Sequence, residues 1–501
     1  MSDANRVNLS PFGHSVGESI VRTKSEDGLA YFAHFGIDKN LIQSSFEKAL
    51  SSGGDWAELF FEHRVAHHVG LQDGAVNRAY SAISLGVGIR VIKGEQTGYS
   101  YTEDLSRRSV LDAAATAAVV ANGSPKLEPI SLNSTPTPDR YPVDIEWSSI
   151  GINEKMPILN TVNEKVFSAD PRIIKVQVGF ANSEGAVFIV DSEGNMRFDR
   201  QPMTRISVSC TAEDNGQRES NSMNLAGRQG FEFYTPKRLD TLVDEAVDRT
   251  AFLFDAKPAP AGNLPIVLAA GSSGILLHEA IGHGMEADFN RKNISVYSDK
   301  LNQSIAPDTV TIVDDGTQAQ ARGSINIDDE GRTGQRTVLV ENGILRTYMH
   351  DRISAKHYGV EPTGNGRRQS FRHAPLPRMR NTYMMPGPHD PEEIIRSVKR
   401  GIYAETFTNG QVMIGAGDFT FYIKTGYLIE DGELTQPIKD TNIIGNGPDV
   451  LQKTDMVGND FKFDEGGWVC GKDGQSVPVS LGMPTVRVSG ITVGGVNEAE
   501  L

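Results

Sequence analysis

Apolar and polar residues alternate with a period of two along much of the first half of the chain. The stretches 56–71 and 84–92 show this alternation, and Lys93-Gly94-Glu95 marks a turn into residues 97–102. Such alternation is typical of half-buried β-strands, because successive side chains point to opposite faces. A hairpin is therefore predicted at this turn. Four more strands, each between turn residues, are predicted over 173–180, 186–190, 195–198 and 204–211.

Four stretches of the same half show the longer period of an amphipathic helix. Residues 105–121 are rich in alanine and end at Asn122-Gly123, which is a typical helix C-cap. The other helices are predicted over 42–50, 158–169 and 238–254. Proline-rich segments at 125–142 and 255–265 indicate a linker and a domain boundary, respectively.

The second half opens with a predicted buried strand, 264–270, a Gly/Ser loop, 271–274, and a helix that carries two histidines. Beyond this helix the pattern is almost wholly that of strands. Asn342-Gly343, for example, predicts a hairpin turn between strands at 337–340 and 345–349. These elements predict an α+β fold with an N-terminal half of mixed sheet and helices. The C-terminal domain is β-rich and carries the histidine helix.

The predicted boundaries divide the chain into three parts. Residues 1–45 are an N-terminal extension, and residues 46–255 are an α+β domain with a break near 125–142. Residues 256–501 are the β-rich C-terminal domain. A chain of 501 residues is long enough to form two or more domains, each with a sizeable core.

The charge balance argues against polyanionic partners. A net charge of −15 and a pI near 5.3 disfavour nucleic acid or an anionic membrane as the main partner. No apolar stretch is long enough to cross a bilayer, and the N-terminus lacks the apolar core of a signal peptide. The only two cysteines, Cys210 and Cys470, exclude a disulfide framework, so a cytoplasmic protein is expected.

The residues with the clearest chemistry lie in the predicted helix of the second half. Glu279 directly follows His278, and His283 comes five residues after that first histidine. Two imidazoles and a carboxylate are the residue types that bind a catalytic zinc ion and activate water. A gap of five places the second ring roughly 140° around a regular helix. The pair is therefore either a coincidence or part of a locally widened helix, for which Gly282 offers a place for a π-bulge.

A catalytic zinc ion usually binds three protein ligands, so this pair needs a third. Glu286 and Asp288 follow within two helical turns, as candidates for direct ligands or for partners of the imidazole N–H groups. Cys470 is the other candidate, because a cysteine beside glycine in a polar loop is not placed like a core residue. Cys210, in an alternating strand, is predicted to pack in the core.

A second segment, at residues 370–382, is braced by prolines and rich in hydrogen-bond donors. One interpretation is that the segment orients a substrate backbone or a developing oxyanion. The other is that it is a structural loop. Gly364-Asn365-Gly366 lacks the lysine and the strand–helix context of a phosphate loop, so nucleotide binding is not expected.

Several separate blocks of sequence resemble the TldD/PmbA family of zinc peptidases, and specifically its TldD branch. The longest block is 274–289, which contains the HExxxH motif from His278 to His283. Further matching blocks follow in the same order at 362–368, 377–382, 456–460 and 470–476. The resemblance covers most of the chain from about Trp56 and is densest after Pro265.

The resemblance implies a role for each residue of the candidate site. It implies that His278, His283 and Cys470 bind Zn²⁺ and that Glu279 is the general base. It also implies a cytoplasmic enzyme that hydrolyses unfolded or flexible peptides, including leader peptides and antitoxin-like substrates. Family members form homodimers, or heterodimers with a PmbA/TldE-type paralogue that lacks an intact metal motif. The alternatives are a non-catalytic, metal-stabilised scaffold or regulatory binding partner, and a zinc hydrolase of small amides.

Overall fold

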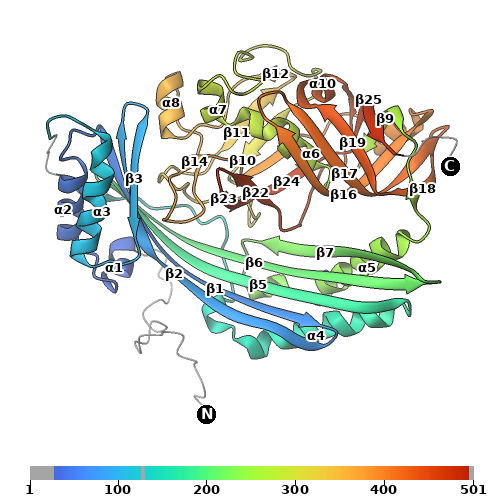
Figure 1. Ribbon diagram of the computed structural model, residues 1–501, viewed down its shortest axis with the longest axis horizontal. Coiled ribbons are helices and arrows are strands. Elements are labelled where there is room, and N and C mark those ends of the chain that lie inside the picture. Colours follow the sequence, from blue (N-terminus) through green and yellow to red (C-terminus); the bar gives the residue numbers. More distant parts are fainter. Residues whose placement is uncertain (1–26, 126–129, 496–501) are drawn as a thin grey trace.

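The computed structural model describes residues 27–125 and 130–495. Its N-terminal half is built around one seven-stranded sheet, in the order β3-β2-β1-β5-β6-β4, with β7 also paired to β6. All neighbours are antiparallel except the short β4 beside β6. The strands are β1 Trp56–Gln72, β2 Ala75–Lys93, β3 Gln96–Thr102, β4 Asn133–Ser134, β5 Ile173–Asp191, β6 Asn195–Asp214 and β7 Gln217–Gly227. The sheet curves beneath the C-terminal half, so one of its faces looks toward that half (Figure 1).

One predicted turn in this sheet is wrong. The strands expected at 173–180 and 186–190 are a single continuous strand, β5. Residues 182–185 between them stay in register with β1, opposite residues 64–67. Backbone hydrogen bonds to the neighbouring strand therefore outweigh the local turn preference of asparagine, serine and glycine. Strand β6 merges two predicted strands in the same way.

Helices cover the sheet at both ends, and all four predicted helices are confirmed with shifted bounds. They are α2 Lys39–Ala49, α3 Arg107–Ala117, α4 Ile152–Ala169 and α5 Pro236–Phe252, and a short helix that was not predicted, α1 Gly28–Ala33, precedes them. Helices α1, α2 and α3 share a core with β1 and β2, and α4 and α5 pack on β5 and β6 (Figure 1). Of the predicted extension at 1–45, residues 1–26 lie outside the described residues, and residue 45 lies within α2. The three-part division stays a prediction.

The C-terminal half contains two larger sheets and two short hairpins. One sheet has the order β16-β9-β25-β19-β17-β18-β8, with β20 paired to β25, and the other has the order β12-β11-β10-β15-β24-β21. The strands of the first sheet are β8 Lys257–Pro258, β9 Gly262–Leu268, β16 Arg400–Met413, β17 Asp418–Glu430, β18 Glu433–Lys439, β19 Thr441–Asn446, β20 Thr454–Val457 and β25 Val486–Gly494. Those of the second are β10 Ile312–Asp315, β11 Arg336–Glu341, β12 Ile344–Leu345, β15 Asn381–Met384, β21 Lys462–Phe463 and β24 Ser480–Met483. The hairpins are β13 Gly366–Arg367 with β14 Leu376–Pro377, and β22 Val469–Lys472 with β23 Gln475–Pro478.

The β-rich character expected for this half is confirmed, and so is the α+β fold class. The hairpin turn predicted at Asn342-Gly343 joins β11 to β12, and both turn residues have the positive φ that such a turn requires (48° and 76°). Only short helices follow the histidine helix in the described chain: α7 Ala287–Arg291, α8 Arg352–Tyr358, α9 Pro391–Arg396 and α10 Gly447–Gln452. Within residues 27–125 and 130–495, no helix combines the length and the apolar character needed to cross a membrane.

The histidine helix, residues 274–285, lies between these two sheets. It contacts β15 and β24 of one sheet and β16 and β17 of the other. Its apolar residues Ile275, Leu276 and Ile281 are at most 6% exposed and belong to the largest hydrophobic core of the chain. The helix is therefore held on both sides, which makes its position rigid.

Candidate metal centre

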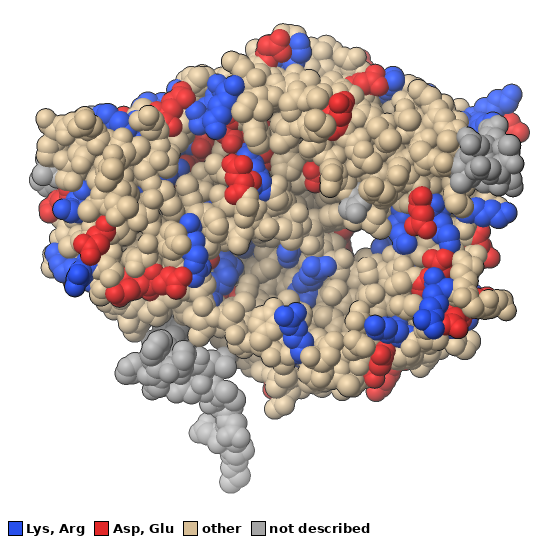
Figure 2. Space-filling model, viewed as in Figure 1, with Lys and Arg blue, Asp and Glu red and all other residues tan. Residues whose placement is uncertain are grey.

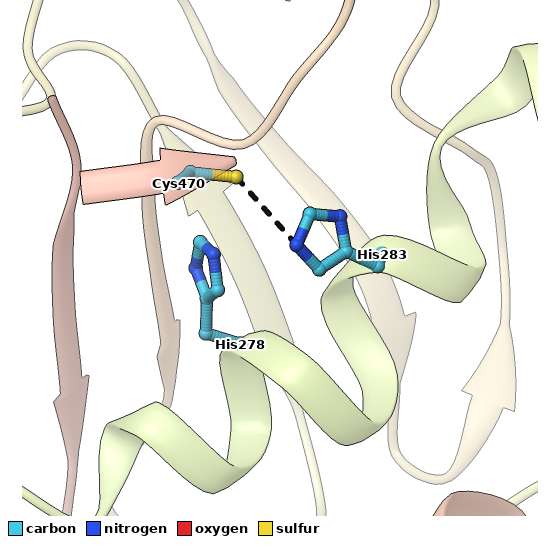
Figure 3. Close-up of side chains that lie close together, drawn as sticks. All are labelled: His278, His283 and Cys470. Carbon is cyan, nitrogen blue, oxygen red and sulfur yellow. Dashed lines mark hydrogen bonds between the residues drawn. The ribbon is translucent and has the colours of Figure 1, made fainter. Parts of the chain in front are cut away.

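The histidine helix is widened at the motif. A short α-helix, α6 (Gly274–Leu277), passes into a π-helical turn at His278–Gly282 and then into a 3-10 turn at His283–Met285. A π-turn has a longer repeat than an α-turn, so it brings positions five apart closer to one face. The ring centroids of His278 and His283 are 5.2 Å apart, with their planes inclined by 81° (Figure 3). The predicted widening is confirmed, and the two rings are neighbours.

Gly282 allows this turn to pack closely against a buried methionine. A Cβ atom on Gly282 would lie 2.1 Å from Sδ of Met379, which is fully buried. The φ of Gly282 is −60°, so its backbone is that of an ordinary right-handed helix. The glycine is therefore required by close packing and not by an unusual backbone conformation.

Cys470 reaches the two histidines from the hairpin β22–β23. Its Sγ lies 3.6 Å from Nε2 of His283 (Figure 3). One potential ligand atom from each of His278, His283 and Cys470 lies within 4.8 Å of the other two. Tetrahedral zinc, with Zn–S of about 2.3 Å and Zn–N of about 2.0 Å, places sulfur and nitrogen ligands about 3.5 Å apart. The donor types and their separation therefore fit a single zinc ion.

The surroundings of Cys470 favour its thiolate. All three donor residues are buried. Burial raises the pKa of the Cys470 thiol, but His278 and His283 outweigh this effect, and the pKa lies well below its usual value. Because the thiolate is the form that binds zinc, the metal-binding form of the cysteine is the favoured one here.

Glu279 lies at the edge of this donor cluster. Its side chain is 22% exposed, and its Oε2 lies 3.8 Å from Nε2 of His283, the same nitrogen that faces Cys470. The carboxylate is thus accessible to solvent and next to the donor atoms. A carboxylate in this position can accept a proton from a water molecule beside the cluster.

Glu286 orients the ring of His283 from the other side. Its Oε2 lies 3.1 Å from Nδ1 of His283 and 3.1 Å from Nζ of Lys472. Burial raises the pKa of Glu286, but Lys472 and then His283 outweigh it and bring the pKa to about 2. An ionised carboxylate only accepts hydrogen bonds, so Nδ1 of His283 carries a proton, and Nε2, which faces Cys470, is the ring nitrogen left for a metal. Of the two roles expected for Glu286, the structure shows that of an imidazole partner.

Two buried cations, Lys472 and Arg378, complete this network, and the sequence pattern assigned neither of them a role of its own. Nζ of Lys472 lies 2.7 Å from Asp288, so Asp288 pairs with this cation and not with the donor cluster. Nη2 of Arg378 donates a hydrogen bond of 2.6 Å to the backbone carbonyl of Cys470. Lys472 could have been found from the sequence, because two residues after Cys470 in a strand it shares the face of the cysteine.

The segment at residues 370–382 supports the hairpin that carries the cysteine. Arg378 also donates to the carbonyl of Gln475, and Nε2 of Gln475 donates to the carbonyl of Ala374 at 3.0 Å. His373 forms only a local contact, 3.3 Å from the Ser370 hydroxyl, among the contacts of the described residues. These contacts favour the structural interpretation of the segment over the oxyanion role.

Three models of one protein family match the chain. The model described as PmbA/TldA metallopeptidase domain 1 matches residues 57–121, and the central domain of the same family matches residues 145–251. The PmbA/TldA metallopeptidase C-terminal domain matches residues 261–495, which include the whole donor cluster. Together the three models match most of the chain.

Individual proteins show the same relationship. A metalloprotease TldD homologue of Haemophilus influenzae is 40% identical over 451 residues, which are 88% of this chain and 93% of that protein. A zinc metalloprotease TldD homologue of Saccharolobus solfataricus is 28% identical, covering 90% of this chain and 98% of that protein. The solved structure of TldE from Thermococcus kodakarensis has a TM-score of 0.71 at 19% identity and covers 91% of this chain and 99% of that one. At this identity the last likeness shows a shared fold.

Proposed function

The chain belongs to the PmbA/TldD family of metallopeptidases, and from this membership we propose that it is a zinc-dependent peptidase of unfolded or flexible peptides. One observation carries the proposal: two histidines and a cysteine bring three donor atoms within 4.8 Å of one another. His278, His283 and Cys470 are the proposed ligands of Zn²⁺. Glu279 is the proposed general base.

The chain's own residues account for the proton transfers. When bound, zinc supplies Lewis acidity, which polarises a carbonyl group and makes water nucleophilic near pH 7. Glu279 accepts the proton of the attacking water and then donates it to the leaving amine. Glu286 holds the Nδ1 proton of His283, which keeps the Nε2 lone pair directed at the site. Arg378 holds the backbone of Cys470 in place.

The burial of the ligands supports a flexible substrate. His278, His283 and Cys470 are 2%, 5% and 1% exposed, so a folded domain cannot bring its own peptide bond to them. The space-filling view shows a hollow between the curved sheet and the C-terminal half, which an extended segment can enter (Figure 2). Hydrogen bonds to the peptide backbone would hold such a segment with little dependence on its side chains. Leader peptides and antitoxin-like segments have the flexibility this requires.

Zinc content and peptide cleavage, measured on the same samples, test this function. The purified protein should bind one zinc ion per chain and cleave a flexible peptide. Chelation should remove both properties and added zinc should restore both. The same peptide sequence, held inside a folded host domain, should resist cleavage. Zinc-loaded protein that cleaves no flexible peptide, with or without a partner chain, would contradict the proposal and favour a structural metal.

We also propose that the chain works as a dimer, with itself or with a TldE-type paralogue. Within the described residues, 75–83 of β2 pair with β1 alone, because β3 pairs only with residues 87–93. Val76, Tyr80 and Ile83 are 49%, 51% and 47% exposed along this strand. An unpaired strand edge with exposed apolar side chains suits a second chain. Light scattering of the purified protein, alone and mixed with the paralogue, tests this proposal, and a monomer in both samples would contradict it.

The two cysteines support a cytoplasmic location. Cys210 packs in the core beside Thr250 of α5, as predicted, and both Cys210 and Cys470 are free. A thiolate ligand is preserved where thiols are kept reduced. Cell fractionation tests the location, and recovery of the protein in a secreted fraction would contradict it.

A further inference from the structure

A second site is indicated by a cavity next to the donor cluster. It has a volume of about 310 Å³ and lies between the large N-terminal sheet and the hairpin β22–β23. Six arginines line it: Arg64, Arg228, Arg322, Arg367, Arg368 and Arg380. The carboxylates among its lining residues are Glu62 and Asp329. Figure 2 shows Lys and Arg side chains on the walls of the hollow between the two halves. The cavity is therefore strongly cationic, although the chain as a whole is acidic.

Several of these arginines have buried donors without an acceptor. Arg228 is 3% exposed and Arg380 is 1% exposed. Nε of Arg228, Nη2 of Arg380 and Nε of Arg368 find no hydrogen-bond partner within the described ranges. A buried guanidinium with unmade hydrogen bonds destabilises a folded chain unless water or a ligand in the cavity satisfies its remaining donors.

The pKa values of these arginines also indicate that positive charges are crowded in the cavity. Burial, followed by the charges of Arg205 and Arg228, lowers the pKa of Arg322 to about 10. Burial also lowers the pKa of Arg228. Arg64 contacts Glu62 and Arg368 contacts Glu58, so these two arginines have carboxylate partners. Arg228 and Arg367 interact with the charges of Asp199 and Asp329, whereas the charges that shift the pKa of Arg322 are those of other arginines. An anion in the cavity would relieve this crowding of like charges.

The cavity and the donor cluster share the hairpin β22–β23. Val469 and Pro478, which line the cavity, face each other in the hairpin, directly before the pair Cys470 and Val477. Nη2 of Arg367 donates to the carbonyl of Pro478 at 2.6 Å. Because a strand advances about 3.3 Å per residue, the cavity wall is within one or two residues of the cysteine along the chain. The cavity and the donor cluster are therefore neighbours on the same hairpin.

We propose that this arginine-lined cavity binds a carboxylate of the peptide substrate, supplied by an Asp or Glu side chain or by the C-terminus. The proposal rests on the proposed peptidase function and adds a charge preference to it. Guanidinium groups match a carboxylate with paired, charge-assisted hydrogen bonds, and in a buried cavity these bonds are strong. The cavity thus selects peptides by one charged group, whereas the donor cluster acts on the backbone.

Peptide binding to an inactive variant tests the proposal without cleavage. In the Glu279→Gln background, fluorescence anisotropy would compare four flexible peptides of one sequence. The first peptide carries one Glu and a free C-terminus. The second has Gln in place of the Glu, the third has a C-terminal amide, and the fourth has both changes. We expect loss of the recognised carboxylate to weaken binding about 10- to 100-fold. If the Gln change weakens binding, the recognised carboxylate is that of the Glu side chain. If the amide weakens binding, it is that of the C-terminus. Equal binding of all four peptides would overturn the proposal.

Arginine variants show whether the preference arises in this cavity. Arg228→Met, or Arg322→Gln if the first variant does not fold, should remove the preference for the carboxylate peptide. Arg228→Met loses the contact of the guanidinium with the Tyr141 ring, and Arg322→Gln loses a hydrogen bond to the carbonyl of Trp468, so the thermal unfolding temperature of each variant is measured beside its binding. The control, Arg249→Gln on α5, removes an ion pair with Glu245 and should keep the preference. A preference that persists in a folded cavity variant would overturn the proposal.

The two proposals fail in different ways. If the wild-type protein cleaves no peptide but the carboxylate preference and its dependence on Arg228 remain, the peptidase proposal fails and the cavity site stands. If the wild-type protein cleaves the four peptides with equal kcat/KM and binds them equally, the peptidase stands and the cavity proposal fails.

Discussion

Sγ of Cys470 lies 3.6 Å from Nε2 of His283, although 187 residues separate the two in the sequence. The first residue belongs to a short hairpin, and the second begins the 3-10 turn that follows the π-turn between the two sheets. A metal ion bound between them would link the two ends of the C-terminal half. Metal binding should therefore contribute to the stability of this half as well as to its chemistry.

Removal of the Cys470 thiol should reduce metal binding. Cys470→Ala leaves two histidine ligands, so we expect the zinc content of purified protein to fall well below one ion per chain. The matched control is Cys210→Ala, which removes the other buried free thiol and should keep its zinc. Metal analysis of both variants provides the measurement. Unchanged zinc in Cys470→Ala would indicate a carboxylate as the third ligand.

Glu279→Gln should separate metal binding from catalysis. The amide keeps the size of the side chain but cannot accept the proton of water, so kcat should fall by about 10²- to 10⁴-fold. Zinc content should stay at the wild-type level, because the three donor atoms are unchanged. Cleavage of a flexible peptide and metal analysis of the same sample check both statements. A variant that cleaves at the normal rate would refute the role of Glu279.

Gly282→Ala should be destabilising, although alanine favours a helix over glycine by about 1 kcal/mol. The added Cβ would lie 2.1 Å from Sδ of Met379, and overpacking of this kind costs about 1–3 kcal/mol. We expect a lower unfolding temperature and weaker zinc binding, since the π-turn must shift. Gly471→Ala is the control, because its Cβ would meet no atom within 4 Å. Equal stability of the two variants would contradict the packing argument.

Loss of the Glu286 carboxylate should weaken zinc binding without removing a proposed ligand. In Glu286→Gln the hydrogen bond that orients His283 is altered, and changes of this kind reduce metal affinity about 10- to 100-fold. Asp288→Asn is the matched control, because it also removes a carboxylate from Lys472 but does not touch the imidazole. Competition with a zinc chelator measures both affinities. If the two variants lose affinity equally, the effect comes from Lys472 and not from orientation of His283.

His350 should make the stability of the protein sensitive to acid. Burial lowers its pKa from 6.5 to about 4. Between these values the unfolded chain binds a proton that the folded chain does not bind. The free energy of unfolding should therefore fall as the pH falls, by up to about 1.4 kcal/mol per pH unit. Above pH 6.5 this contribution stays constant.

The variant His350→Phe tests this dependence. It keeps an aromatic ring against Tyr358, whose centroid lies 5.3 Å away, and it cannot bind a proton. Urea unfolding at pH 7 and pH 5 should show a smaller loss of stability in the variant than in the wild type. The same loss in both proteins would contradict the prediction.

Local sequence patterns predicted much of the fold. The alternation at 56–71 and the alanine-rich run at 105–121 correspond to β1 and α3, and Asn342-Gly343 forms the expected turn. These features depend on neighbours in the chain, which is why their period and residue types suffice. The turn predicted at 182–185 was wrong because β1, more than 100 residues away in the sequence, pairs through it. A strand partner of this kind is not visible in a local pattern.

The sequence by itself determined the chemistry of the candidate site. The residue types of His278, Glu279 and His283 indicated zinc hydrolysis, and a metal site shared across a gap of five residues required a widened helix, which the structure shows. Only the tertiary structure decided which distant groups meet there. It places the thiol of Cys470 at the imidazoles, Lys472 and Glu286 behind them, and a cavity of arginines beside the hairpin. The physical reason is that side-chain periodicity reports which face of an element is buried, whereas the packing of separate elements decides what that face contacts.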